Sequence, residues 1–214
     1  MSGQIRRWDD PRIQQANPAL NLPHRDIVIV ARQDSSGTTF ALTNHLGAIS
    51  LAWREQSLGI GKLVEWPASA MLASGNEGVA SRIKISEGSI GYVEFGFAKR
   101  LGLPMAVLEN EAGKFITPDD IAGVQALSEA SAETPAGLNQ SIVDPSAAAA
   151  YPIVTFSWLL LYRKYEDALK GSAVRDFVAW GLSNGQTFSK KLGYLPLPDE
   201  VAASGRQALG GVGQ

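Results

Sequence analysis

The succession of apolar and polar positions is clearest near the start of the chain. Residues 27–30 are a run of apolar, mostly β-branched side chains, which predicts a buried strand. Residues 32–38 are polar or glycine, which predicts a turn. From residue 39 to about residue 53 apolar side chains recur on or near one face, which predicts a helix. These side chains are Phe40, Leu42, Leu46 and Ile49.

The rest of the chain continues to alternate between the two patterns. Strands are expected at residues 62–66, 88–95, 106–109 and 151–162. Helices are expected at residues 76–85, 118–132, 168–182 and 187–192, in a short stretch within residues 1–25, and from Asp199 onward. Residues 133–150 are rich in alanine and have the character of a linker. Strands that alternate with helices predict an α/β fold with a layered sheet.

The turn at residues 32–38 contains the groups that an oxyanion site needs. A helix start offers unpaired backbone N–H groups and the positive end of the helix dipole. Ser36, Gly37 and Thr38 would let an anion approach that backbone closely. Arg32 adds a planar guanidinium that can bind an oxyanion through two N–H groups. The same residues also suit an ordinary capped turn, in which Arg32 simply pairs with Asp34 at the surface, so both interpretations stay open.

A second helix start, Gly75-Asn76-Glu77-Gly78, offers a further place where an anion could bind. The same residues suit a helix cap with a close packing contact through Gly78. We favour the cap for this segment.

Composition removes several classes of function. The 214 residues carry a net charge of −2 with no basic block, so nothing favours binding of nucleic acid. The absence of cysteine excludes disulfides, thiol catalysis and cysteine metal sites. The longest apolar run, residues 154–162, is too short to span a membrane.

Enzyme and metal chemistry find no support in the remaining residues. His24 and His45 are the only histidines, and their spacing fits no metal motif, which needs three or four converging ligands. We expect His45 to be a solvated or capping residue. Ser35 and Ser36 lack the Gly-x-Ser-x-Gly surroundings of a serine nucleophile. The chain is therefore expected to be no enzyme and to need no metal and no cofactor.

Several short motifs occur in an order that is specific to one family. They are Ile5–Pro11, Asn17-Pro18, Arg32–Phe40, Gly61-Lys62, Val64–Pro67, Gly75–Ala80, Ile90–Glu94 and Tyr151–Phe156. In this order they resemble the periplasmic phosphate-binding proteins of the high-affinity phosphate ABC transporter. The resemblance extends from about residue 4 to about residue 200.

The resemblance implies a periplasmic-binding-protein-like, type II, two-lobed α/β fold that is incomplete in this chain. Residues 1–150 would form the second lobe with the anion loop, and residues 151–214 the crossover strand and the C-terminal part of the first lobe. The implied phosphate-binding residues are Arg32, Ser36, Gly37 and Thr38. Asp34 would orient Arg32 without touching the ion.

The implied function is binding of inorganic phosphate as the solute-binding component of phosphate ABC transport, with a membrane permease as partner and the periplasm as location. Family members begin with a signal peptide and a long segment that supplies the opposite wall of the site. This chain begins Met1-Ser2-Gly3 and enters the family pattern after that segment, so as written it is expected to carry no signal peptide. We therefore expect weak or no phosphate binding by the chain alone, together with self-association or association with the missing segment. A truncated or vestigial scaffold or interaction protein, with weak or no phosphate binding, is the alternative.

Overall fold

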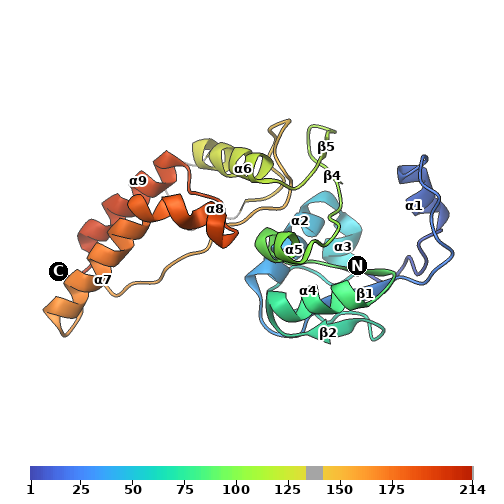
Figure 1. Cartoon of the computed structure of the whole chain (residues 1–214), viewed down its shortest axis with the longest axis horizontal. Coiled ribbons are helices and arrows are strands. Elements are labelled where there is room, and N and C mark those ends of the chain that lie inside the picture. Colours follow the sequence, from blue (N-terminus) through green and yellow to red (C-terminus); the bar gives the residue numbers. More distant parts are fainter. Residues whose placement is uncertain (134–141, 214) are drawn as a thin grey trace. The chain divides into compact units, whose positions relative to one another are not determined.

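The computed structural model describes residues 1–133 and 142–213 and divides the chain into two compact units, Met1–Pro104 and Met105–Gln214. Part of the stretch 133–150 that was expected as a linker lies outside the described residues. Among the described residues, no helix is long and apolar enough to cross a membrane. The two units are considered separately below (Figure 1).

The first unit is built on a three-stranded parallel sheet (Figure 1). Strand β1 (Val28–Arg32) lies in the centre, between β2 (Met71–Ala73) and β3 (Ser89–Gly91). All of β1 after its first residue is buried, as expected for a strand with covered faces. Arg32, its last residue, lies opposite Ala73, the last residue of β2, so these two strands end level with each other.

Five helices belong to this unit: α1 (Pro11–Ala16), α2 (Gly37–Ile49), α3 (Leu51–Gln56), α4 (Gly75–Ile85) and α5 (Phe95–Leu101). Val30, Ala73 and Val79 form a buried cluster that joins the sheet to α4, with Ile83 and Val93 packed against it. This cluster fixes the start of α4 beside the end of β1. The predicted α/β fold is confirmed, as are the first strand and the helix over residues 76–85.

The single helix expected over residues 39–53 is wrong, because the structure divides it at Ser50. This residue has an extended backbone, with φ −143° and ψ 108°, and its hydroxyl accepts a hydrogen bond from Trp53 N at 3.2 Å. Ser50 therefore begins a new helix where the apolar pattern predicted continuity. Competition between a serine side chain and the helical backbone is the general reason for such breaks.

The buried face of α2 also differs from the expected one. Thr39, Thr43 and His45 are buried, whereas Ile49 is 56% exposed. The threonine hydroxyls are buried with hydrogen bonds: Thr43 Oγ1, for instance, donates to Thr39 O at 2.9 Å. Since such bonds offset the cost of burying a hydroxyl, a polar face can pack inward here and the apolar pattern does not reveal it. The expectation that His45 is solvated or capping is wrong, because it is 6% exposed.

Two expected strands in this unit need correction. Residues 62–66 form no strand, and the strand that precedes α4 is β2, at Met71–Ala73. Its first two residues are exposed, so no apolar alternation announces it. The strand expected at residues 88–95 is reduced to Ser89–Gly91, because Glu94 caps a helix that begins at Phe95.

The second unit is mainly helical. Strands β4 (Leu108–Glu109) and β5 (Phe115–Ile116) pair as an antiparallel hairpin, so β4 confirms part of the strand expected at 106–109 and β5 was missed. The helices are α6 (Asp120–Glu133), α7 (Ala168–Gly181), η1 (Asn184–Phe188), α8 (Ser189–Leu192), α9 (Asp199–Ala208) and η2 (Leu209–Gly211). Val178, Leu209 and Val212 form a buried cluster. The helices expected after residues 118, 168 and 198 are confirmed.

The long strand expected at residues 151–162 is wrong. The segment has no regular secondary structure, and within the described residues no neighbouring strand pairs with it. An extended segment becomes a strand only when another strand satisfies its backbone N–H and C=O groups, whatever its side chains favour. The division into lobes at residue 150 refers to a complete two-lobed protein and stays a prediction.

A candidate anion-binding site at three strand ends

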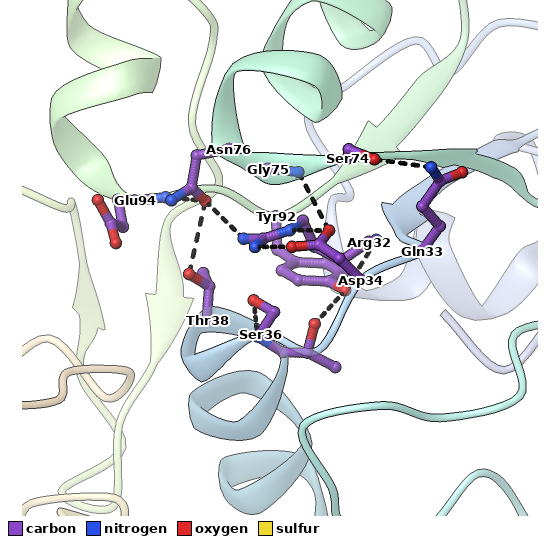
Figure 2. A network of polar contacts seen from close by, with 11 residues as sticks. Arg32, Gln33, Asp34, Ser36, Thr38, Ser74, Gly75, Asn76, Tyr92 and Glu94 are labelled. Atoms are coloured by element: carbon purple, nitrogen blue, oxygen red, sulfur yellow. Dashed lines mark hydrogen bonds and ion pairs between the residues drawn. The ribbon is translucent and has the colours of Figure 1, made fainter.

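The carboxyl ends of three parallel strands meet in the first unit, and a polar network spans them (Figure 2). β1 leads into the 32–38 turn and α2, β2 leads into α4, and β3 leads into α5. The crevice beyond the carboxyl ends of the strands is where open α/β sheets bind ligands. The turn that the sequence singles out therefore lies where the topology favours a site.

Arg32 is the centre of the network. Its Nε donates to Asp34 Oδ1 at 2.8 Å, and its Nη2 donates to Asp34 Oδ2 at 2.5 Å. The Arg32 side chain is only 10% exposed, whereas that of Asp34 is 39% exposed. The pair is therefore no flexible surface contact, because the guanidinium is held inside the protein.

The carboxylate of Asp34 is held from its other side by α4. Gly75 N, at the first residue of α4, donates to Asp34 Oδ1 at 3.1 Å. The backbone of Gly75 has a φ of +66°, a conformation that glycine adopts without strain. The hydrogen bonds from Arg32, and then the one from Gly75, hold the pKa of Asp34 well below its ordinary value, so the residue is ionised at neutral pH. Asp34 in turn raises the pKa of Arg32.

The guanidinium keeps part of its donor capacity. An arginine side chain carries five N–H donors. Two point to Asp34, and one on Nη1 reaches Asn76 Oδ1 at 3.5 Å. Among the described residues no acceptor takes the other two, so one N–H remains on each terminal nitrogen. This pair is the geometry that binds two oxygens of a tetrahedral anion.

The start of α2 provides further donors. Ser36 caps the helix, with its Oγ accepting from Thr39 N at 3.1 Å, and Ser36 N donates to Lys62 O at 2.8 Å. Within the described part of the chain, the N–H groups of Gly37 and Thr38 meet no acceptor. They are the first two amides of the helix, where the helix dipole favours a negative charge. Ser36 is 3% exposed, so the cap is firmly packed.

Sequence reasoning gave no role to Tyr92 and missed that of Asn76. Tyr92 Oη accepts from Arg32 N at 3.1 Å and forms a hydrogen bond with Thr39 Oγ1 at 2.7 Å, which joins the end of β1 to α2. Burial raises the pKa of the Tyr92 phenol, so it is protonated at neutral pH. Asn76 Oδ1 also accepts from Thr38 Oγ1 and Glu94 N. The sequence could signal these two only through their place near a strand end: Asn76 is the second residue of α4, which follows β2, and Tyr92 follows β3 directly.

The other candidate residues of the sequence analysis make structural contacts among the described residues. A Cβ added at Gly78 would lie 3.4 Å from Ala73 Cβ, which fits the favoured interpretation of a close packing contact. His24 Nδ1 lies 2.7 Å from Asp9 Oδ2 in an exposed pair. Among residues 1–133 and 142–213 no cluster of three potential metal ligands occurs.

Comparison with known proteins identifies the family. A family model described as the PBP superfamily domain matches residues 1–184. The chain belongs to the PBP superfamily. This confirms the family and the fold class that the sequence motifs indicated.

Curated relatives carry a more specific name. The phosphate-binding protein PstS of Pasteurella multocida (strain Pm70) is 38% identical over 199 residues, which are 93% of this chain and 57% of that protein. The one from Haemophilus influenzae is 36% identical over 202 residues, 94% of this chain and 60% of that protein. The one from Methanocaldococcus jannaschii is 37% identical over 224 residues, which cover 97% of this chain and 57% of that protein. The chain thus spans less than two thirds of the length of these PBP-superfamily relatives.

Solved structures agree on the PBP-superfamily fold. A high-affinity periplasmic phosphate-binding protein called PfluDING, solved with bound phosphate, superposes with a TM-score of 0.68 at 23% identity, over 100% of this chain and 68% of that one. The phosphate-binding protein of Stenotrophomonas maltophilia gives 0.63 at 20% identity, over 96% and 61%. At this level of identity the likeness concerns the fold alone.

Proposed function

We propose that the first unit forms one face of a phosphate-binding site in a solute-binding protein of phosphate ABC transport. One observation carries the proposal: Asn76 joins the guanidinium of Arg32, which has two unused N–H groups, to the hydroxyl of Thr38, in the helix turn where the amides of Gly37 and Thr38 are open. The names of the curated relatives supply the ion, since each is called a phosphate-binding protein. Such a site binds and releases its ion without a chemical step, so the protein would be no enzyme.

Each donor has a distinct role in this proposal. Arg32 binds two phosphate oxygens through its free N–H pair, and Asp34 fixes the plane of the guanidinium without touching the ion. Ser36 donates its hydroxyl, because the cap to Thr39 N uses only a lone pair of the oxygen. Gly37 donates its backbone N–H. Thr38 donates both its N–H and its hydroxyl.

The chain alone should hold the ion from one side only. Charge-assisted hydrogen bonds contribute about 1.5–3 kcal/mol each, but in contact with water they are reduced by the high dielectric. In the family that the motifs resemble, the groups on the opposite side come from a segment that this chain does not match. We therefore propose weak phosphate binding by this chain and tight binding only in the presence of such a segment.

Partner and location follow from the same relatives. If the chain acts as they are named, its partner is the membrane permease of a phosphate transporter and its location is the periplasm. PfluDING, the relative solved with bound phosphate, is itself a periplasmic protein. Nothing in the net charge of −2 favours nucleic acid as a partner.

A second candidate function is supported by the second unit. Leu160 is 96% exposed and Leu169 is 82% exposed, and several aromatic side chains of the same unit are exposed as well. Exposed apolar surface of this kind marks contact sites between proteins. A scaffold or interaction protein that binds phosphate poorly would bind its partner protein through this surface. It would show no site-specific response to phosphate in the experiment below.

A titration of inorganic phosphate followed by NMR tests the proposed function, because it detects even millimolar binding. We expect saturable shifts of the Gly37 and Thr38 amide signals, and their loss in Arg32→Ala. Arg82→Ala is the matched control, because Arg82 lies in the last turn of α4, outside the network, and removes the same charge. Sodium chloride at equal ionic strength should leave the two signals unmoved. Unchanged Gly37 and Thr38 signals under phosphate, or equal shifts in Arg32→Ala, would refute the assignment.

A further inference from the structure

Asn76 joins all three strand ends through a single oxygen (Figure 2). Its Oδ1 accepts from Arg32 Nη1 at 3.5 Å, from Thr38 Oγ1 at 3.5 Å and from Glu94 N at 3.3 Å. These donors come from the end of β1, the first turn of α2 and the residue before α5. One of the three, the Thr38 hydroxyl, is a donor that the proposed function assigns to phosphate, and a second, Arg32 Nη1, also carries one of the unused N–H groups.

The lengths of these contacts set their strength. Hydrogen bonds between nitrogen or hydroxyl donors and oxygen are usually shorter than 3.2 Å, so contacts at 3.3–3.5 Å are weak. An anion can therefore take over the hydroxyl of Thr38, and draw the guanidinium of Arg32 toward itself, without breaking a strong bond to Asn76. The amide of Asn76 is also uncharged, so it directs the guanidinium without neutralising it.

Asn76 works together with its neighbour Gly75. Gly75 N donates to Asp34, whose carboxylate accepts from Nε and Nη2 of the guanidinium. Asn76 Oδ1 accepts from the opposite nitrogen, Nη1. The first two residues of α4 therefore act on both sides of Arg32. Rotation of the guanidinium out of its plane would break contacts on both sides at once.

We propose that Asn76 is a positioning residue, whose uncharged oxygen holds the guanidinium of Arg32 and the hydroxyl of Thr38 toward one point and releases that hydroxyl to an incoming anion, while the two unused N–H groups of Arg32 stay free to bind it. This inference rests on the proposed function for the identity of the anion. It concerns a residue that acts through others, because no contact between Asn76 and the ion is required.

Two substitutions in the full chain test this role. Asn76→Asp keeps an acceptor oxygen and suits a helix start, but it adds a carboxylate beside the guanidinium. Asn76→Ala removes the oxygen. Ser81→Ala, on the exposed side of α4, is the matched control for a small change on the same helix. The measurements are the Kd for inorganic phosphate by NMR, the free energy of unfolding in urea, and the Arg32 guanidinium signals without phosphate.

The positioning role predicts a separation of stability from binding. We expect Asn76→Asp to unfold at the same urea concentration as the parent chain or a higher one, and to bind phosphate at least about tenfold more weakly, because its carboxylate competes for Arg32. Asn76→Ala should weaken binding by about three- to tenfold. Separate Nη1 and Nη2 signals should be present in the parent chain and should exchange faster in Asn76→Ala, since only Asp34 then holds the guanidinium.

The contrary results are equally specific. If both Asn76 variants bind phosphate as the parent chain and Ser81→Ala do, the positioning role is refuted while the proposed function stands. If the parent chain shows no phosphate binding, the proposed function fails. The Arg32 signals then decide separately: an Nη1–Nη2 exchange rate in Asn76→Ala equal to that of the parent chain would refute the positioning as well.

Discussion

The two units of this chain differ in how completely they bury their aromatic side chains. In the first unit a central parallel strand is covered on both faces, and its aromatic side chains are at least partly buried. In the second unit the aromatic side chains reach the surface. Among the described residues, every aromatic that is more than about a third exposed belongs to this unit. These residues are Phe115, Trp158, Tyr162, Phe177, Trp180, Phe188 and Tyr194.

This difference separates structure that a unit completes with its own residues from structure that needs contact with further protein. Every contact of the candidate site is made within the first unit, between segments that the sheet brings together. The second unit leaves Leu160 and Tyr162 exposed on a segment that pairs with no strand among the described residues. The hydrogen-bond donors of the candidate site can thus all come from one unit, while the unit that follows it in the sequence still exposes apolar surface.

The largest effect should come from completing the binding protein. We expect a chimera that joins this chain to the unmatched part of the Pasteurella multocida relative to bind phosphate far more tightly than this chain alone. Three or four further charge-assisted hydrogen bonds contribute about 5–10 kcal/mol, which corresponds to several powers of ten in Kd. Calorimetry on both proteins measures the difference.

The same pair of proteins defines the contradictory outcomes. Arg32→Ala in the chimera should weaken binding more than Asp34→Ala, because only Arg32 contacts the ion in the proposed site. Micromolar binding by this chain alone would show that one face suffices. A chimera that folds and binds no phosphate would contradict the phosphate assignment.

Local patterns predicted the first unit well where one segment decides the structure. The strand before Arg32 and the helix after Gly75 follow from their own residues, and so does the capped turn at Ser36. The pairing of Asp34 with Gly75 could not be predicted, because it joins residues 41 positions apart. Such contacts depend on which strands are neighbours, and the apolar pattern does not specify that.

The failures lie where structure depends on partners or on polar burial. Residues 151–162 have the composition of a strand, yet no strand pairs with them in the described structure. Thr39 and Thr43 occupy the buried face of α2 because hydrogen bonds satisfy their hydroxyls, which an apolar periodicity does not register. Asn76 was missed for a related reason, since its three donors come from separate segments.

A second prediction compares the truncation of an apolar side chain to alanine in the two units. Val30 is fully buried at the centre of the sheet, whereas Leu160 is 96% exposed. Val30→Ala should lower the free energy of unfolding by about 1–3 kcal/mol, because it leaves a cavity in a packed core. Leu160→Ala should change it by less than about 0.5 kcal/mol. Urea unfolding followed by tryptophan fluorescence measures both, and equal losses would contradict the contrast between the units.

A third prediction concerns self-association through the exposed segment. Leu159, Leu160 and Tyr162 are each more than 70% exposed, and exposed apolar surface favours association. We expect the chain to form dimers or larger species, and Leu159→Ser with Leu160→Ser to raise the dissociation constant about tenfold. Light scattering over a range of concentrations tests this, with Leu51→Ser in the first unit as the control. A monomer at all concentrations would show that these side chains attract no second copy.

The smallest effect expected is the response of the site to acid. Hydrogen bonds from Arg32 and Gly75 hold the pKa of Asp34 below its ordinary value of 3.8. A carboxyl group whose pKa is lowered on folding stabilises the protein at a pH above its unfolded pKa, and this contribution is lost as the pH falls toward the folded pKa. Asp34→Asn should therefore be less stable than the parent chain at pH 7, and the gap should narrow below about pH 4. Urea unfolding at pH 7 and pH 3 measures the gap, with Glu111→Gln, an exposed carboxylate of the second unit, as control. A gap that stays constant or widens in acid would mean that the ionisation of Asp34 adds nothing to the free energy of folding, so that the lowered pKa has no consequence for stability.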